Sequence, residues 1–349
     1  MKPVKIAIDA MGGDHAPQAI IDGAFLGAAD GGTEIILVGN EPILTRMLAR
    51  HPAQGTLGSN ISVIHAPETV SMDESPASVI RKKQTSSIYV ANEWVKRLEA
   101  QAVISAGNTG ASMACSLFVL GPLVGVDRPA VASPFPTLVG TSILIDAGAN
   151  VDCKPHHLVQ FAMMGSSYAC KMWGIPRPKV GLLNIGEEEQ KGNELTKEVF
   201  SLLKKSALHF IGNIEGRDLH TGRADVVVCD GFVGNIALKT YEGVAEGVVQ
   251  LLKKEIMATP GRKLATIFLS SAFDAFQKKL DYAEYGGSLL LGVNGVSVIC
   301  HGRASDKAIQ NAIRVAKESL QHEVNRHIQD QITEQMPLMR GGLLKTAGV

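Results

Sequence analysis

Short apolar runs alternate with longer segments of helical periodicity along most of the chain. The runs have the length of buried strands and cover Val4–Ile8, Glu34–Val38, Ile61–Ile64, Ala102–Ser105, Thr141–Ile145, Val180–Asn184, Leu208–Ile211, Asp225–Cys229, Ser288–Leu291 and Val296–Ile299. Helix-length segments between them include Gln18–Ala29, Ile88–Leu98, His156–Trp173 and Glu194–Lys204. This alternation predicts an α/β fold with a largely parallel sheet, in which ligands gather beyond the carboxyl ends of the strands.

Two segments depart from this alternation. Pro67–Thr85 is acidic and then basic, so it is expected to form either a lid over a substrate or a solvated loop. Tyr241–Tyr285 has the pattern of two long helices broken near Pro260. Lysines and arginines flank that break, and apolar residues such as Leu264 and Phe268 follow it. This pattern favours a helical hairpin that contacts a membrane surface, an acidic protein or a second subunit.

No internal repeat or low-complexity linker divides the 349 residues. We therefore expect one catalytic unit over residues 1–335, folded as a single body or as two lobes, with the hairpin at about 241–285 projecting from it. Residues 336–349 are expected to form a flexible tail.

Composition narrows the class of protein. The 34 Lys and Arg balance the 34 Asp and Glu, and a net charge of zero argues against a nucleic-acid binder. The five cysteines have no C-x-x-C spacing, so neither a disulfide framework nor a metal site is expected. No uncharged apolar run reaches about 18 residues, and the chain opens on a strand. We therefore expect no transmembrane helix, no signal peptide and a location in the reducing cytoplasm.

The first strand leads into a glycine-rich corner. Asp9 ends the strand, and Gly12 and Gly13 precede Asp14 and His15. Adjacent glycines let backbone amides approach an anion closely, although a glycine pair alone is more typical of a plain strand-to-helix turn. The flanking Asp9, Asp14 and His15 favour an anion site. The spacing is not G-x-G-x-x-G, so a dinucleotide fingerprint is not predicted.

Other predicted strands end in the same way, with glycine beside polar side chains. These residues are Asn108 and Thr109, Asp146, Lys191, Asp230 and Asn235, and His301 and Arg303. A helix cap or a solvated loop is the alternative at each of them, and Asn235 is expected to begin a long helix. Asp146 is expected to orient its neighbours rather than act as an acid. Together these strand ends predict a small anionic reactant held by many donors.

Several of these segments resemble those of the bacterial acyl-ACP:phosphate acyltransferase family, where ACP is the acyl carrier protein. They are Asp9-Ala10-Met11-Gly12-Gly13-Asp14-His15-Ala16-Pro17, Ser105-Ala106-Gly107-Asn108-Thr109-Gly110-Ala111, Gly192-Asn193-Glu194-Leu195, Cys229-Asp230-Gly231-Phe232-Val233-Gly234-Asn235 and Tyr285-Gly286-Gly287. The resemblance extends from about residue 4 to residue 333.

This resemblance implies an isocitrate/isopropylmalate dehydrogenase-like α/β fold and a homodimer. It implies an enzyme without a cofactor that makes acyl-phosphate from long-chain acyl-ACP and inorganic phosphate for phospholipid synthesis. It also implies peripheral membrane contact through the hairpin and cooperation with a membrane glycerol-3-phosphate acyltransferase. Lys191 and Asn235 fall where the family's catalytic lysine and asparagine are expected. The residues expected to bind phosphate or shape its pocket are Asp9, Gly12, Gly13, Asp14, His15, Asn108, Thr109, Asp230, His301 and Arg303.

Three alternatives remain. The nearest is a phosphotransacetylase-like enzyme that acts on a short acyl-CoA. An NAD-linked decarboxylating dehydrogenase needs paired metal-binding aspartates and an adenine site, and neither pattern is found in the sequence. A non-catalytic scaffold that recruits carrier protein to the membrane leaves the polar strand ends unexplained.

Overall fold

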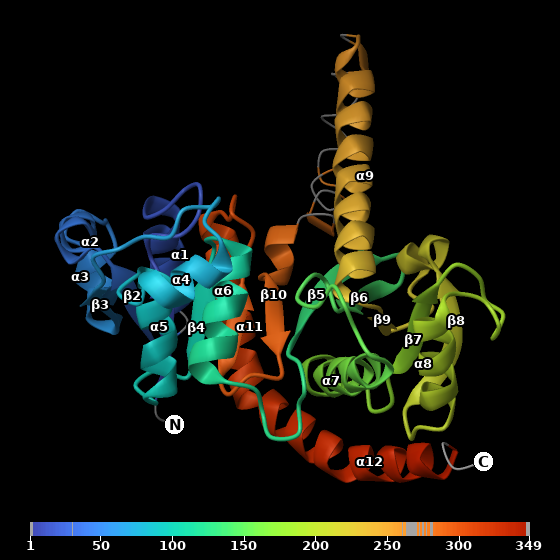
Figure 1. Cartoon of the computed structure of the whole chain (residues 1–349). Coiled ribbons are helices and arrows are strands. Elements are labelled where there is room, and N and C mark those ends of the chain that lie inside the picture. Colours follow the sequence, from blue (N-terminus) through green and yellow to red (C-terminus); the bar gives the residue numbers. More distant parts are fainter. Residues whose placement is uncertain are drawn as a thin grey trace.

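The computed structural model describes residues 3–29, 31–259, 261–262, 271, 273, 276, 278–279 and 282–346, without the side chains of Tyr282 and of 336–346. Within them an 11-stranded sheet has the order β3-β2-β1-β4-β11-β10-β5-β6-β9-β7-β8 (Figure 1). Its strands are β1 (Val4–Asp9), β2 (Thr33–Gly39), β3 (Ile61–His65), β4 (Ala102–Ser105), β5 (Ala130–Thr137), β6 (Gly140–Ile145), β7 (Lys179–Asn184), β8 (His209–Glu215), β9 (Val226–Val228), β10 (Ser288–Leu291) and β11 (Val296–Ile299). All ten predicted strands are present, and β5 is the strand that the pattern did not predict.

The sheet consists of two parallel halves joined by antiparallel strands. Neighbours are parallel from β3 to β11 and again from β6 to β8. The three central pairs, β11–β10, β10–β5 and β5–β6, are antiparallel. The predicted α/β fold with a mostly parallel sheet is confirmed. The strands of the two halves therefore run in opposite directions along the ladder.

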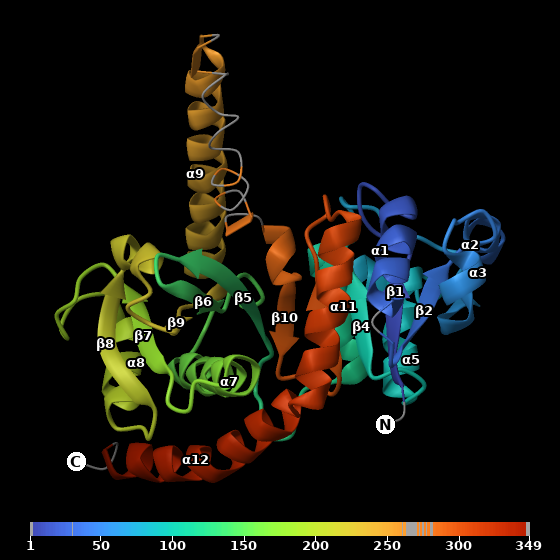
Figure 2. The ribbon, with the colours of Figure 1, turned by 180° about the vertical axis from the view of Figure 1, so that it is seen from behind.

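Helices cover both faces of the sheet. They are α1 (Gln18–Ala28), α2 (Glu41–Leu48), α3 (Gln54–Leu57), α4 (Pro76–Lys82), α5 (Ser87–Lys96), α6 (Thr109–Cys115), α7 (Pro155–Trp173), α8 (Glu194–Lys204), α9 (Gly231–Met257), α11 (Asp306–Gln321) and α12 (Val324–Thr346). Figure 2 shows α1 and α11 beside β1 and β4, α7 below the strands of the other half, and α12 along the lower edge of the molecule. Their apolar side chains and those of both halves of the sheet form one continuous core.

The core on the opposite face is divided. Alternate residues of β1, β2 and β4 pack against α5 and α6 in one cluster. The matching face of β6, β7 and β9 forms a second cluster with residues such as Leu144 and Ile214. Leu238 of α9 packs against both clusters. The start of α9 therefore lies between the two halves, over the central strands.

The predicted hairpin and tail are described in part. α9 supplies the first helix and projects from the body (Figure 1). Pro260, Leu264 and Phe268 lie outside the described residues, so the rest of the hairpin stays a prediction. The expected tail begins inside α12, and its first part is helical through Thr346. Its flexibility stays a prediction. None of the helices in the described part of the chain combines the length and the apolar character needed to cross a membrane.

Candidate active site

The corners that follow β1, β4 and β11 pack against one another. The Asp14 amide donates to the Gly302 carbonyl at 2.8 Å, and the Cys300 amide donates to the Ser105 carbonyl at 2.8 Å. Gly13 has a φ of 113°, and a Cβ on it would lie 3.0 Å from the Ala106 carbonyl oxygen. Only glycine tolerates both that φ and that approach. The predicted glycine pair therefore holds three strand ends in contact.

Two predicted phosphate ligands at this corner hold the local structure instead of facing outward. The Asp9 carboxylate is buried and accepts a hydrogen bond from the Ser105 hydroxyl at 2.8 Å, and burial raises its pKa above the ordinary value. The Asn108 side chain caps α6 through the Ala111 amide. Its amide group donates to the backbone carbonyls of Ser71, Met72 and Glu74. The capping alternative therefore describes the Asn108 side chain, which anchors the predicted lid segment.

A second corner forms where β6 and β9 end. The buried Asp146 carboxylate accepts from the backbone amides of Val131, Gly148, Ala149 and Asn150, and burial raises its pKa. It orients the turn after β6, in the role that the sequence predicted for it. The arrangement fixes the backbone beneath the first turns of α9.

The expectation that Asn235 begins the long helix is wrong. α9 begins at Gly231, and the Asp230 side chain caps it by accepting from the Val233 amide at 2.9 Å. Asp230 can take this role because its backbone is extended while Gly231 is already helical. Asn235 lies inside the helix, half-buried beside Gly148, and its side chain is directed toward the cleft that it helps to line.

Substitution of Gly234 by alanine is expected to lower the free energy of unfolding by about 1–3 kcal/mol or more. A Cβ there would lie 1.9 Å from the Asp146 carbonyl oxygen, so α9 would have to move away from the sheet. Gly243→Ala in the same helix is the control, because a Cβ at Gly243 meets no described atom within 4 Å. Denaturant unfolding compares the two, and equal stability of both variants would contradict the close packing.

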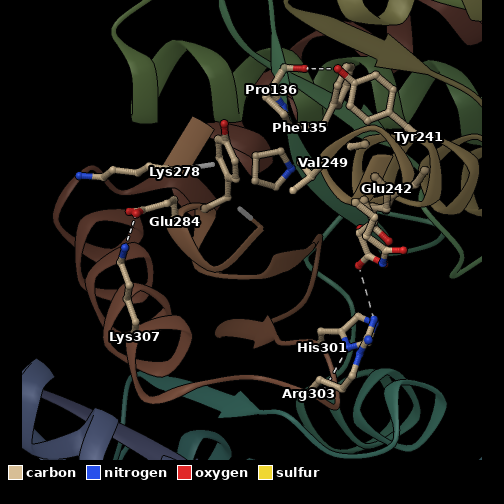
Figure 3. A pocket seen from close by; sticks show the side chains of 16 residues that line it. Phe135, Pro136, Tyr241, Glu242, Val249, Lys278, Glu284, His301, Arg303 and Lys307 are labelled. Atoms are coloured by element: carbon tan, nitrogen blue, oxygen red, sulfur yellow. Dashed lines mark hydrogen bonds and ion pairs between the residues drawn. The ribbon is translucent and has the colours of Figure 1, made fainter. Parts of the chain in front are cut away.

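Two connected cavities lie in the cleft between the halves. The smaller, of about 170 Å³, is lined by Asn235 and Lys239 of α9, by Thr109 beyond β4, and by Ser133 and Ser288 of the central strands. The larger, of about 700 Å³, extends along α9 (Figure 3). Residues common to both linings are Pro134, Leu238, Glu242, Tyr285 and His301. The cavities therefore join, and the smaller one is the more polar of the two.

The structure places the remaining predicted site residues at different distances from this cleft. His301 lines both cavities, and Arg303 lines the larger one with an ion pair to Glu246 at 3.6 Å. Asp14 and His15 are exposed at the first corner. Lys191 lies in the exposed loop after β7, and it does not appear among the described residues that line either cavity.

Four polar residues of the cleft were missed by the sequence reasoning: Ser133, Lys239, Glu242 and Ser288. Lys239 and Glu242 follow Asn235 by four and seven residues, a spacing that places them on one helix face and that the sequence did contain. The Ser133 and Ser288 hydroxyls lie 2.6 Å apart on neighbouring strands. Ser133 stands beside Pro134 in the strand that the pattern did not predict.

Comparison with known proteins identifies the family. The family model described as fatty acid synthesis protein matches residues 4–327. The phosphate acyltransferase of Pelotomaculum thermopropionicum is 51% identical over 329 residues, which cover 94% of this chain and 95% of the relative. The chain belongs to the phosphate acyltransferase family. It is an acyltransferase, as the sequence predicted.

Solved structures agree with this family's α/β fold. A phosphotransacetylase from Streptococcus pyogenes aligns with a TM-score of 0.60 at 15% identity, covering 91% of this chain and 94% of that one. A 4-hydroxythreonine-4-phosphate dehydrogenase from Klebsiella pneumoniae aligns with a TM-score of 0.50 at 14% identity, covering 94% and 100%. At these identities the likeness concerns the fold alone.

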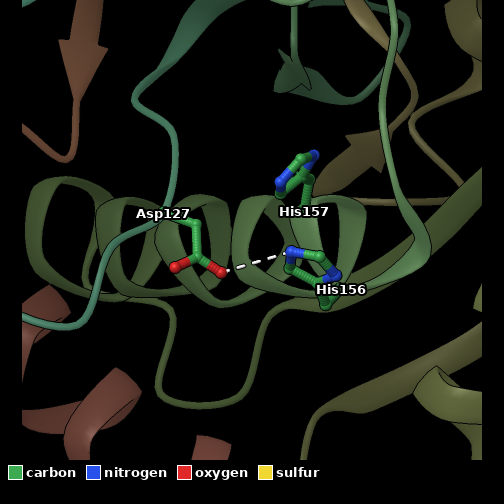
Figure 4. Close-up of side chains that lie close together, drawn as sticks. All are labelled: Asp127, His156 and His157. Carbon is green, nitrogen blue, oxygen red and sulfur yellow. Dashed lines mark ion pairs between the residues drawn. The ribbon is translucent and has the colours of Figure 1, made fainter.

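In this acyltransferase, the side chains of Asp127, His156 and His157 lie close together (Figure 4). Residues of these types can bind a metal ion. His156 Nε2 lies 3.3 Å from the Asp127 carboxylate. However, His157 Nδ1 accepts the Lys154 backbone amide at 3.0 Å, so the proton of the neutral ring lies on Nε2. A metal bound at Nε2 would require the ring proton to lie on Nδ1. The Nδ1–H group would then point at the Lys154 backbone N–H, and two donors cannot form a hydrogen bond. The cluster therefore fits a helix cap with an ion pair better than a cation site.

His157 is expected to make stability depend on pH. Burial, followed by the neighbouring His156, lowers the pKa of His157 from 6.5 to about 4. Between pH 6.5 and pH 4, His157 becomes protonated in the unfolded chain but stays neutral in the folded chain. The free energy of unfolding therefore falls as the pH drops from 6.5 toward 4. The loss from pH 7 to pH 5 is about 2 kcal/mol. Denaturant unfolding of the parent and of His157→Asn at both values measures it, and an equal loss in both proteins would contradict this origin.

Proposed function

We propose that this phosphate acyltransferase family member transfers a long-chain acyl group from acyl-ACP to inorganic phosphate, giving acyl-phosphate for phospholipid synthesis. The observation that carries the proposal is the junction of a small polar cavity at Asn235 with a large cavity along α9. The first has room for an inorganic anion. The second offers an apolar wall to a fatty chain through Pro134, Phe135, Leu238, Ala245 and Val249.

Phosphate needs little activation as a nucleophile. Its second pKa lies near 6 to 7, so a dianion exists at neutral pH without a strong base. The enzyme mainly has to desolvate the phosphate dianion and orient one of its oxygens toward the thioester carbonyl carbon. Positioning of this kind is worth about 7–11 kcal/mol, more than a single proton transfer contributes.

The site residues support direct transfer without an acyl-enzyme. Cys300 lines the small cavity, but burial raises the pKa of its thiol to about 12, so it is a poor nucleophile at neutral pH. We assign Asn235 and backbone amides near Gly13 as donors to the phosphate or to the carbonyl oxyanion. Lys191 is assigned to offset phosphate charge, by movement of its exposed loop toward the cleft.

The assay that tests this function offers the protein phosphate with palmitoyl-ACP or with acetyl-CoA and traps acyl-phosphate chemically. Efficient turnover of palmitoyl-ACP and little of acetyl-CoA is the expected result. The reverse preference would favour the phosphotransacetylase-like alternative. No acyl-phosphate from either donor would favour a non-catalytic scaffold.

Docking of the acidic carrier protein requires a basic surface near the cleft. Arg81 and Lys82 are exposed at the end of α4, whereas Lys83 pairs with Glu74 at 2.6 Å. We therefore assign docking to Arg81 and Lys82, together with the lysines of the hairpin. Because the screening length is near 10 Å at 0.1 M salt, the Michaelis constant for acyl-ACP should rise with ionic strength. A constant that is insensitive to salt would contradict this assignment.

Assembly is proposed to use the projecting helix. Exposed apolar residues recur along one stripe of α9: Phe232, Ile236, Val244, Val248 and Leu251. This stripe supports a homodimer, and sedimentation of Val248→Glu as a monomer beside a dimeric parent is the expected result. A parent that sediments as a monomer would contradict it.

We also propose peripheral membrane contact through the hairpin, a cytoplasmic location and cooperation with a membrane glycerol-3-phosphate acyltransferase. Vesicle sedimentation of charge substitutions at Leu264 and Phe268 tests the contact. Unchanged vesicle binding would refute it. The finer fold class, isocitrate/isopropylmalate dehydrogenase-like, is proposed on the same family resemblance and is supported by the dehydrogenase match.

A further inference from the structure

Glu242 stands where the two cavities meet. It lies seven residues, about two helical turns, beyond Asn235, so both side chains share the face of α9 that lines the cleft. It is half-buried, and it is the only carboxylic acid among the described residues common to both linings. If phosphate occupies the small cavity and the acyl chain the large one, the reacting carbonyl lies beside Glu242.

The other ionisable groups at this junction are Tyr285 and His301. The Tyr285 hydroxyl donates to the Lys279 carbonyl at 2.9 Å, so its proton is already held by the backbone. His301 Nδ1 accepts the Arg303 amide at 3.2 Å, which leaves the neutral ring with its proton on Nε2. A neutral imidazole in that state donates a hydrogen bond but does not take up the proton of phosphate at this nitrogen. Within the part of the chain that the structure describes, no hydrogen bond engages the Glu242 carboxylate, so its oxygens are the acceptor atoms at this junction.

The proposed transfer has a leaving-group problem. Attack by phosphate on a thioester gives a tetrahedral intermediate that can expel either phosphate or thiolate. Phosphate, with a second pKa near 6 to 7, is the less basic of the two, since an alkyl thiol has a pKa near 8.5. As long as the attached phosphate keeps its P–OH proton, the intermediate therefore returns to reactants more readily than it expels thiolate. Moving that proton from the phosphate to the sulfur favours the products.

We propose that Glu242 is a further catalytic residue that carries the proton of the attacking phosphate to the departing sulfur. This step rests on the proposed function. As an oxygen of HPO₄²⁻ bonds to the carbonyl carbon, its P–OH proton passes to the Glu242 carboxylate. The C–S bond then breaks, its electron pair stays on sulfur, and the proton moves from Glu242 to that sulfur. The products are the acyl-phosphate dianion and the neutral thiol, with Glu242 again a carboxylate.

The surroundings of Glu242 suit this task. Burial raises its pKa, which makes the carboxylate a better proton acceptor. Glu246 on the same helix acts in the same direction. The positive charges of Lys239, of Arg303 and, when its ring is protonated, of His301 lower the pKa of Glu242 and so oppose the effect of burial. A carboxylate whose pKa is raised accepts a proton more readily and can return it within one turnover.

The test measures acyl-phosphate formation by the full-length parent and by Glu242→Gln, from palmitoyl-ACP and from the para-nitrothiophenyl thioester of palmitate. The aryl thiolate is weakly basic and departs without a proton. Glu242→Gln is expected to lose on the order of 100-fold or more in kcat on palmitoyl-ACP, and its loss on the aryl thioester should be at least about tenfold smaller. Glu93→Gln, an equivalent change at a helix surface glutamate that pairs with Arg97, is expected to keep parental turnover on both.

The outcomes separate the proposals. If the parent forms no acyl-phosphate from palmitoyl-ACP, the proposed function fails before Glu242 is tested. If the parent is active and Glu242→Gln loses equally on both thioesters, or loses nothing, the proton role is overturned. Rescue of His301→Gln instead of Glu242→Gln by the aryl thioester assigns the role to His301. The solvent deuterium isotope effect on turnover of palmitoyl-ACP provides a second measurement, and its persistence in Glu242→Gln would also overturn the proposal.

Discussion

Replacement of Asn235 by alanine is expected to lower kcat by about 100-fold to 1000-fold, the cost of removing one well-placed donor to a developing oxyanion. This effect is expected because of where the Asn235 side chain is held. Asn235 lies on the first turns of α9, which Asp230 caps and which packs closely against Asp146, so its amide is held at the wall of the small cavity. A donor held in this way needs no reorganisation as charge develops on the carbonyl oxygen.

Steady-state kinetics with palmitoyl-ACP and phosphate measure this effect. Thr240→Ala is the matched control, because Thr240 is exposed on the same helix and lines neither cavity. If the turnover of Asn235→Ala is within a few-fold of that of the control, the role assigned to Asn235 is contradicted. A rise in the Michaelis constant for phosphate at unchanged kcat would show instead that Asn235 contributes to ground-state binding only.

Lys191→Ala is expected to reduce turnover by about 100-fold or more. Its ammonium group is a mobile point charge on a flexible stem, suited to meet an anion that enters an open cleft. The loop that carries it follows β7, the neighbour of β9, and the Asn184 side chain holds the loop by donating to the Lys191 carbonyl at 3.1 Å. The expected loss of turnover is therefore accompanied by weaker binding of phosphate.

The control for Lys191 is Lys197→Ala on the exposed side of α8. Unchanged turnover of Lys191→Ala would refute its role. Crystals soaked in phosphate give a direct view. An anion bound away from Lys191, Asn235 and the Gly12–Gly13 pair would contradict the proposed mechanism as a whole.

The sheet was largely predictable from the sequence because most of its strands are short, largely buried apolar runs. β5 is the exception, since Pro134 and Pro136 interrupt its pattern, and proline is usually excluded from interior strands. The structure accommodates both prolines because β10 pairs only with Ala130, Val131 and Ala132. Past that point one side of β5 has no neighbouring strand in the ladder, so a missing N–H costs little there.

The site was predicted less completely than the fold. The strand-end glycines located the corners, because tight contacts such as that of Gly13 require a particular residue type. Asn108 and Asp230 were assigned to phosphate, yet their side chains cap helices, and sequence alone does not separate a cap from a ligand at a strand end. Glu242 was missed because a glutamate in a helix is ordinarily a surface residue, and its burial depends on strands far away in the chain.

The apolar core on the face of the sheet that α1, α7, α11 and α12 cover is continuous across both halves, and this continuity affects how the protein unfolds. That core joins β1 and β2 of one half to β7 and β9 of the other, through α1, α7, α11 and α12. Neither half can melt without exposing residues on which the other depends. A single cooperative thermal transition is therefore expected for the body of the enzyme, even though its opposite face is split by a cleft.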